Sequence, residues 1–113
     1  MSIWESLFSS ASTQTSPLLA EGISIEPDIP ELGEEVKISY EGQLAQRGTD
    51  QIYLHVGYGS DWRNLEDIPM EQYSNGWTCE FVPEDSEVNF CFHDSANNWD
   101  NNNGSNWTLT FSR

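Results

Sequence analysis

Apolar residues occupy every second position in a series of short segments of this chain. These segments are ISIE at 23–26, EEVKISY at 34–40, QIYLHVGYG at 51–59, WTCEFV at 77–82, VNFCFHD at 88–94 and WTLTFS at 107–112. A period of two is typical of a β-strand with one buried face, and turn-forming Gly, Pro, Asn and Asp residues separate the segments. We therefore predict an all-β fold, an immunoglobulin-like antiparallel β-sandwich over residues 23–113, with about six to eight strands.

The segment QIYLHVGYG also predicts which of its side chains face solvent. Ile52, Leu54 and Val56 form one apolar face, which leaves Tyr53 and His55 together on the other. A shift of one residue in register would bury the histidine but expose three aliphatic side chains. We therefore expect His55 on the outer face of the sheet.

Two intervening segments have weaker patterns. EGQLAQRGTD, residues 41–50, is polar with a glycine near each end, and we predict a loop. NLEDIPMEQYSNG, residues 64–76, predicts one irregular strand closed by an Asn75-Gly76 hairpin turn. Its apolar side chains are Leu65, Ile68 and Met70.

The first 22 residues precede the predicted sandwich and differ from it in pattern. Four apolar residues recur at helical spacing within residues 3–8: Ile3, Trp4, Leu7 and Phe8. They predict a short amphipathic helix in an N-terminal tail. Such a helix either docks on its own domain or a second copy, or serves as a hook for a partner enzyme.

The charge of the chain limits the classes of partner. Nineteen acidic and four basic residues give a formal charge of −15. Nucleic acids and anionic membranes are excluded as partners, because binding to them requires clusters of Lys and Arg. A neutral polymer would not be repelled, and solubility alone is an equally good explanation of the charge.

The two cysteines indicate a reducing compartment. Cys79 shares a strand face with neighbouring aromatic residues, whereas Cys91 lies opposite the aromatic face of its own strand. The two sulfurs are then on different sides of their sheets, so we predict free thiols. The N-terminus has no signal-peptide pattern. We therefore expect a cytoplasmic protein, or a secreted one if the chain is part of a larger secreted enzyme.

The segment FCFHDSANNWDNNNGSNW, residues 90–107, differs most from ordinary globular sequence. It has six asparagines within ten residues, with Trp99 among them. Asparagine suits turns, but a tryptophan among polar residues has no evident core to enter and indicates a binding surface. An indole can stack on the C–H face of a sugar ring while neighbouring amides bind its hydroxyl groups.

WDNNNGSNW, preceded by FHD, resembles the signature of starch- and glycogen-binding modules, especially carbohydrate-binding module families 25 and 53. A related string occurs in the glycogen-targeting subunits of protein phosphatase 1. IYLHVGYGSDW resembles the (I/L)-H-x-G-(Y/F) strand with a nearby Trp that supplies half of the sugar site in these families. The resemblance covers about residues 23–113 and implies a β-sandwich that binds α-glucan.

The resemblance assigns His55, Trp62 and Trp99 to sugar binding. We add the amides of Asn101, Asn102 and Asn103 as candidate contacts to the sugar edge. The loop that carries this signature, residues 94–107, is here called the signature loop. Three further residues are expected to structure it: Asp94, Asp100 and Gly104. Trp77 and Trp107 open strands in phase with apolar residues, so we expect them in the core.

Other chemistries fit the sequence less well. DNNNG resembles part of an EF-hand loop, but the twelfth position would be Thr110 rather than Glu, and we predict no metal or cofactor. A sandwich calcium site using Asp94 or Asp100 stays open as an alternative. No catalytic motif accompanies the two histidines, and His93 is expected to bond locally.

The predicted function is therefore non-catalytic binding of starch or glycogen. The alternative is an adaptor that uses residues 3–8 to bind protein, with sugar binding lost.

Overall fold

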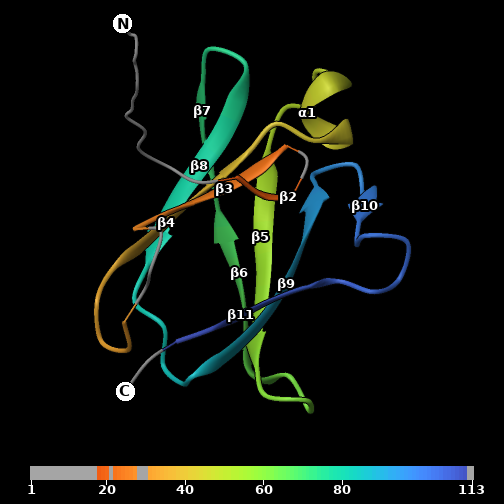
Figure 1. Ribbon diagram of the computed structural model, residues 1–113. Helices are drawn as coiled ribbons and strands as arrows, with labels where there is room; N and C mark the ends of the chain where they lie inside the picture. The colour runs from red at the N-terminus through yellow and green to blue at the C-terminus, as the bar shows by residue number, and fades with distance from the viewer. Residues whose placement is uncertain (1–17, 21, 28–30, 112–113) are drawn as a thin grey trace, which may run out of the picture.

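Two antiparallel β-sheets packed face to face form the protein in a computed structural model, which describes residues 18–20, 22–27 and 31–111 (Figure 1). The elements are β2 (Leu18–Ala20), β3 (Ile23–Glu26), β4 (Val36–Tyr40), α1 (Gln43–Gln46), β5 (Ile52–Tyr58), β6 (Arg63–Pro69), β7 (Glu71–Tyr73), β8 (Gly76–Phe81), β9 (Glu87–Asp94), β10 (Trp99–Asp100) and β11 (Trp107–Thr110). The predicted all-β class is confirmed.

The strand order is that of an immunoglobulin-like sandwich. One sheet has the order β2-β3-β4-β8-β7, and the other has the order β10-β9-β5-β6, with β11 also paired to β9. The segments β3-β4-β8-β7 and β11-β9-β5 correspond to the A-B-E-D and G-F-C orders of that fold. The second sheet is therefore built on two long central strands, β5 and β9.

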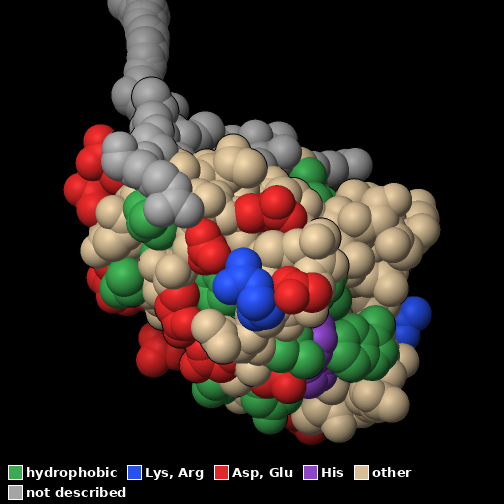
Figure 2. Space-filling view, turned by 90° about the horizontal axis from the view of Figure 1, so that it is seen from below, with side chains coloured by type: hydrophobic (Ala, Val, Ile, Leu, Met, Phe, Trp, Pro, Cys, Tyr) green, Lys and Arg blue, Asp and Glu red, His purple; other side chains and the backbone are tan. Residues whose placement is uncertain are grey.

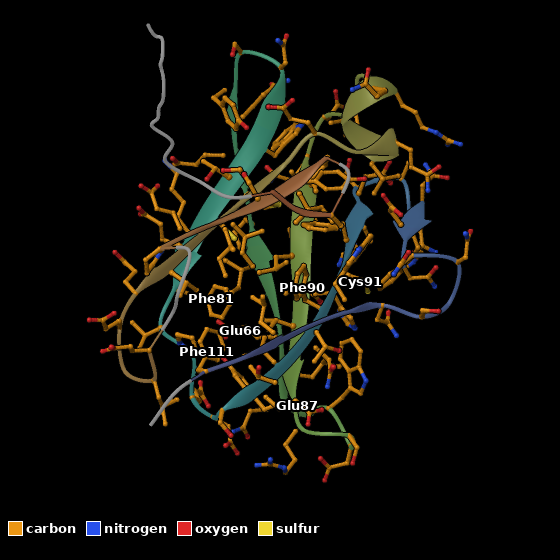
Figure 3. The ribbon with its side chains drawn as sticks, in the orientation of Figure 1. Glu66, Phe81, Glu87, Phe90, Cys91 and Phe111 are labelled. Atoms are coloured by element: carbon orange, nitrogen blue, oxygen red, sulfur yellow. The ribbon has the colours of Figure 1, made fainter. Side chains whose placement is uncertain are left out.

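The alternating residues of both sheets meet in one core. Leu54, Val56, Phe90 and Phe92 on the second sheet are fully buried. Phe90 and the next residue, Cys91, point to opposite faces of β9, as alternation along a strand requires (Figure 3). The outer face of β5 and β9 is thus left to the polar and aromatic residues between the core positions.

Trp77 and Trp107, the two tryptophans near the start of strands, pack as predicted. Trp77 is buried in the core, and Trp107 is partly buried against it. The ring of Trp107 stacks on Phe90, with centroids 6.0 Å apart. Trp107 also lines a surface hollow beside α1.

The prediction of a single strand over residues 64–76 is wrong, because the chain changes sheets there. β6 pairs with β5, whereas β7 pairs with β8 in the opposite sheet. Met70, between them, is buried, whereas Leu65 is 55% exposed. This crossing lets residues 63–69 form the strand beside β5 and sets Asp67 opposite His55.

The predicted loop over residues 41–50 contains the short helix α1. Its apolar residue Leu44 is buried, and the Leu44 backbone N–H donates to the Tyr40 hydroxyl oxygen at 3.1 Å. One buried leucine among polar residues gives too little periodicity to predict a helical turn. α1 lies beside β10, next to the signature loop (Figure 1).

The first sheet begins before the predicted boundary at residue 22. β2 pairs antiparallel with β3, so the first sheet includes Leu18–Ala20. The predicted helix within residues 3–8 lies outside the described residues. In the part of the chain that the structure describes, no helix is long and apolar enough to cross a membrane.

Both cysteines are free and buried, as predicted. Burial, with Glu80 nearby, raises the pKa of Cys79 to about 12. Burial, with Asp67 and Asp100 nearby, raises the pKa of Cys91 to about 11. Both thiols therefore stay protonated at neutral pH and are poor nucleophiles.

Candidate carbohydrate-binding site

Five ring side chains form a continuous surface on the outer face of the second sheet, here called the aromatic face. They are Tyr53 and His55 of β5, Trp62 of the β5–β6 turn, His93 of β9 and Trp99 of β10. Figure 2 shows histidine side chains (purple) between hydrophobic side chains (green) on an open surface. The face is exposed because the inward positions of the same strands already fill the core.

Trp99 is held in position by its neighbours on the aromatic face. Its indole lies against the His93 ring, with centroids 4.4 Å apart, and meets the His55 ring edge-on at 5.0 Å. The indole N–H also donates to the side-chain oxygen of Asn97 at 3.1 Å. The residue nevertheless remains 43% exposed, so one large apolar surface faces water.

The Trp62 ring also lies beside His55, with ring centroids 5.9 Å apart. Its backbone has a φ of 54°, a left-handed conformation that is unusual for a bulky residue. A Cβ at Gly57 would lie 2.8 Å from Cε3 of this indole and 3.0 Å from its Cα. The glycine of the (I/L)-H-x-G-(Y/F) pattern therefore provides the space in which Trp62 packs on β5.

The two indole planes are strongly inclined to each other. The His55 ring makes an angle of 35° with Trp62 and 88° with Trp99. The difference of these angles sets a minimum, so the indole planes differ by at least 53°. The two indoles therefore present inclined surfaces beside His55, which a flat, extended ligand would fit poorly.

Asp67 joins the two histidines of the aromatic face. Its Oδ1 is 2.7 Å from Nδ1 of His55 and 2.8 Å from Nε2 of His93. Partial burial alone would raise the pKa of the Asp67 carboxyl, but the hydrogen bonds from the two imidazoles outweigh it and lower that pKa. Asp67 is therefore ionised at neutral pH.

The ionised carboxylate fixes the hydrogen positions on His55. A carboxylate accepts only, so Nδ1 of His55 must carry the hydrogen that faces Asp67. In the neutral imidazole, Nε2 is then an acceptor. His55 can accept a hydrogen bond from a hydroxyl group on the ligand side.

The sequence placed His93 on the outer face of its strand but gave neither His93 nor Asp67 a role in the site. The expectation that His93 bonds locally is wrong, because its partner Asp67 is 26 positions away. The alternation of VNFCFHD does put His93 on the outer face, which was the available signal. Asp67 could be found only from the β5–β6 register, which the sequence misassigned.

Asp94 organises the start of the signature loop. Its Oδ1 accepts hydrogen bonds from the backbone N–H groups of Ala96 and Asn98, and its Oδ2 accepts one from the Asn98 side chain. Burial would raise the pKa of Asp94, but these bonds hold it below its ordinary value. Both oxygens are engaged within the loop, which disfavours calcium binding at this residue.

Asp100 anchors β10, within the signature loop, to the rest of the fold. Its Oδ2 accepts a hydrogen bond of 2.6 Å from the Tyr40 hydroxyl, which ties β10 to the opposite sheet. Gly104 has a φ of 91°, and its N–H donates to the side-chain and backbone oxygens of Asn101. The tight turn of the loop is thus closed by Asn101 and Gly104.

The candidate sugar-binding amides of Asn101, Asn102 and Asn103 do not belong to the aromatic face. Asn101 accepts from Gly104, and the Asn102 side chain donates to the Asn106 backbone oxygen. Asn102 and Asn103 line a hollow of about 570 Å³ beside α1, together with Gln43 and other residues. None of the five aromatic-face residues lines this hollow, so the amides and the indoles form two adjoining surfaces.

Comparison with known proteins supports one class, a starch-binding carbohydrate-binding module. Residues 36–90, just under half of the chain, match the model of the starch/carbohydrate-binding module of family 53. The matched range includes His55, Trp62 and Asp67, whereas His93 and Trp99 follow it.

One protein with a similar sequence is an α-amylase of Clostridium acetobutylicum. It is 36% identical over 80 residues, which are 68% of this chain and 10% of the amylase. The chain therefore spans about a tenth of the length of that relative. No solved structure matches the chain.

Proposed function

We propose that the protein binds α-1,4-glucan, as starch or glycogen, without catalysing a reaction on it. Sugar faces stack on Trp62 and Trp99, and a sugar hydroxyl donates to Nε2 of His55. The observation that carries this proposal is the pair of solvent-accessible indoles, inclined by at least 53° to each other, that both lie beside that histidine. Stacking rings and a hydrogen-bond acceptor between them match the two kinds of surface that a sugar presents.

The shape of the aromatic face favours an α-1,4-glucan over an extended polysaccharide. Successive glucose units of an α-1,4-linked chain turn along a helix, so their faces point in different directions. Two inclined indoles can each take one such face, whereas a flat ribbon would contact only one of them.

Charge and similarity support the same ligand class. The protein carries a formal charge of −15, and a neutral glucan is not repelled by it. The family-53 model describes a starch- or carbohydrate-binding module, and the relative is an amylase. In the cytosol the ligand would be glycogen, and within a secreted amylolytic enzyme it would be starch.

The expected affinity is modest. Each stacked ring removes ~100 Å² of apolar surface from water, worth ~2.5 kcal/mol at ~25 cal/mol per Å². Each hydrogen bond adds ~1 kcal/mol net. After several kcal/mol for lost freedom of motion, the dissociation constant falls between about micromolar and about millimolar. This range suits a tether to a polymer that offers many binding positions.

Affinity electrophoresis through gels that contain amylopectin or glycogen tests the proposal. The wild-type protein should be retarded, and Trp62→Ala and Trp99→Ala should each reduce the retardation. Tyr73→Ala is the matched control, because Tyr73 is an exposed aromatic residue on β7 of the opposite sheet. Unretarded wild-type protein, or equal retardation of all variants, would contradict the proposal.

A further inference from the structure

Two imidazoles and one carboxylate converge at the edge of the aromatic face. Nδ1 of His55, Nε2 of His93 and a carboxylate oxygen of Asp67 all lie within 4.8 Å of one another. The three residues come from β5, β9 and β6, which are adjacent strands of one sheet. The paired backbone of these strands therefore holds the three side chains together without any contribution from a loop.

This donor set has the chemistry of a transition-metal site. Imidazole nitrogen suits zinc, copper and nickel, and a carboxylate is a common third ligand. Calcium and magnesium prefer sites made entirely of oxygen, so they fit poorly. Three protein ligands leave one position of a tetrahedral zinc ion open to solvent.

The spacing of the donor atoms needs only a small adjustment. Ligands ~2.0–2.1 Å from a tetrahedral zinc ion are ~3.3 Å from each other. The Asp67 oxygen is now 2.7 Å and 2.8 Å from the two nitrogens, with a hydrogen between the atoms of each pair. Loss of those hydrogens, withdrawal of the Asp67 oxygen by about half an ångström and closure of the two nitrogens, which lie within 4.8 Å of each other, to that spacing would admit the ion. The Asp67 side chain is 49% exposed and free enough to move by this amount.

We propose that His55, Asp67 and His93 bind a divalent transition-metal ion of the zinc type. The inference follows from the donor geometry and does not depend on glucan binding. The ion sits on the Nδ1 side of His55, which leaves Nε2 for the sugar. A neutral imidazole that binds metal through Nδ1 carries its hydrogen on Nε2, so the ion converts that nitrogen from an acceptor to a donor. A glucose hydroxyl can satisfy either state.

Calorimetric titration of the metal-free protein with zinc chloride, without sugar, tests this site. We expect saturable binding of one ion per chain that survives an excess of magnesium. His93→Ala and Asp67→Asn should each weaken it at least about tenfold, since even an outer-shell partner is worth that much. Glu71→Gln, which neutralises an exposed carboxylate on β7, is the control and should leave zinc binding unchanged.

Nitrogen NMR of the wild-type imidazoles provides a test that needs no variant. Zinc should shift Nδ1 of His55 and Nε2 of His93 far more than the other ring nitrogens. Weak heats that magnesium abolishes would show binding to the acidic surface only and would overturn the proposal. So would imidazole signals that zinc leaves unmoved. Because no glucan is present, either result is independent of the proposed function.

Discussion

The indole of Trp99 lies against the imidazole of His93, with centroids 4.4 Å apart and planes inclined by 30°. His93 in turn stacks on Tyr53, at 5.0 Å and 15°. The exposed tryptophan is thus the outermost of three rings that are supported by the sheet. Its position depends on contacts with side chains from strands far apart in the sequence.

Replacement of His93 by alanine should weaken glucan binding by removing the ring behind Trp99. Aromatic pairs are worth about 0.5–1.5 kcal/mol, so we expect an affinity about two- to twelvefold lower. His93→Phe is the matched variant, because it keeps a flat ring and loses only the bond to Asp67. Calorimetry with maltoheptaose should rank wild type and His93→Phe above His93→Ala. Equal affinities for all three would show that His93 does not support Trp99.

Two substitutions of Trp62 should distinguish its role in glucan binding from the effect of its strained backbone on stability. Trp62→Ala and Trp62→Gly both remove the stacking ring and should both lower glucan affinity. The left-handed φ of 54° costs a residue with a Cβ about 1 kcal/mol that glycine does not incur. We therefore expect Trp62→Gly to be more stable than Trp62→Ala by about that amount in urea denaturation. The opposite order would mean that the turn is not held in this conformation.

Gly57→Ala should disturb Trp62 without touching His55. The added methyl group would lie 2.8 Å from the indole and 3.0 Å from the Trp62 Cα, so the turn must shift. We expect lower glucan affinity and lower thermal stability. Combining Gly57→Ala with Trp62→Gly should recover part of the lost stability, because the contact with the indole is gone while the close approach to the Cα remains. If the stability losses of the two single variants simply add in the double variant, the added methyl group does not clash with the Trp62 side chain.

Stability should fall steeply in alkali because of Tyr40. Burial, then the hydrogen bond to Asp100, raises the pKa of the Tyr40 hydroxyl far above its ordinary value. Unfolded tyrosine loses its proton near pH 10. The folded state keeps that proton, so its stability is complete below about pH 10 and declines as the pH rises further.

Tyr40→Phe tests this assignment. The variant leaves the Asp100 carboxylate and the Leu44 N–H without a partner, which should cost about 1–3 kcal/mol at neutral pH. The same change should make the decline above pH 10 shallower, because the Tyr40 contribution is gone. Some decline should remain, since burial also raises the pKa of Tyr58 and of Tyr73 in both proteins. Urea midpoints measured from about pH 8 to about pH 11 would show it. Parallel curves for the two proteins would exclude Tyr40 as the cause.

The sequence was most informative where one local pattern determines the structure. Alternation alone put His55 on the outer face and left Ile52, Leu54 and Val56 for the core. It could not reveal that the chain changes sheets at Met70, because an apolar position looks the same in either sheet. Asp67 was missed for that reason, since its role follows from a register between two strands.

The signature loop shows a second limit of sequence reasoning. The amides of Asn101 and Asn102 have the chemistry to bind a sugar, but the loop uses both for its own turns. Composition cannot separate these uses, since the residue that tolerates left-handed backbone is also the residue that bonds to hydroxyl groups.

The most direct measurement is a titration of the protein with maltoheptaose, followed by tryptophan fluorescence and by calorimetry. The wild type should show a saturable change in emission with a dissociation constant between about micromolar and about millimolar. Trp99→Ala and Trp62→Ala should each lower the affinity by about tenfold or more, as loss of a stacked ring implies. An unchanged emission spectrum with no heat of binding at millimolar sugar, or tryptophan variants that bind as well as the wild type, would contradict the account.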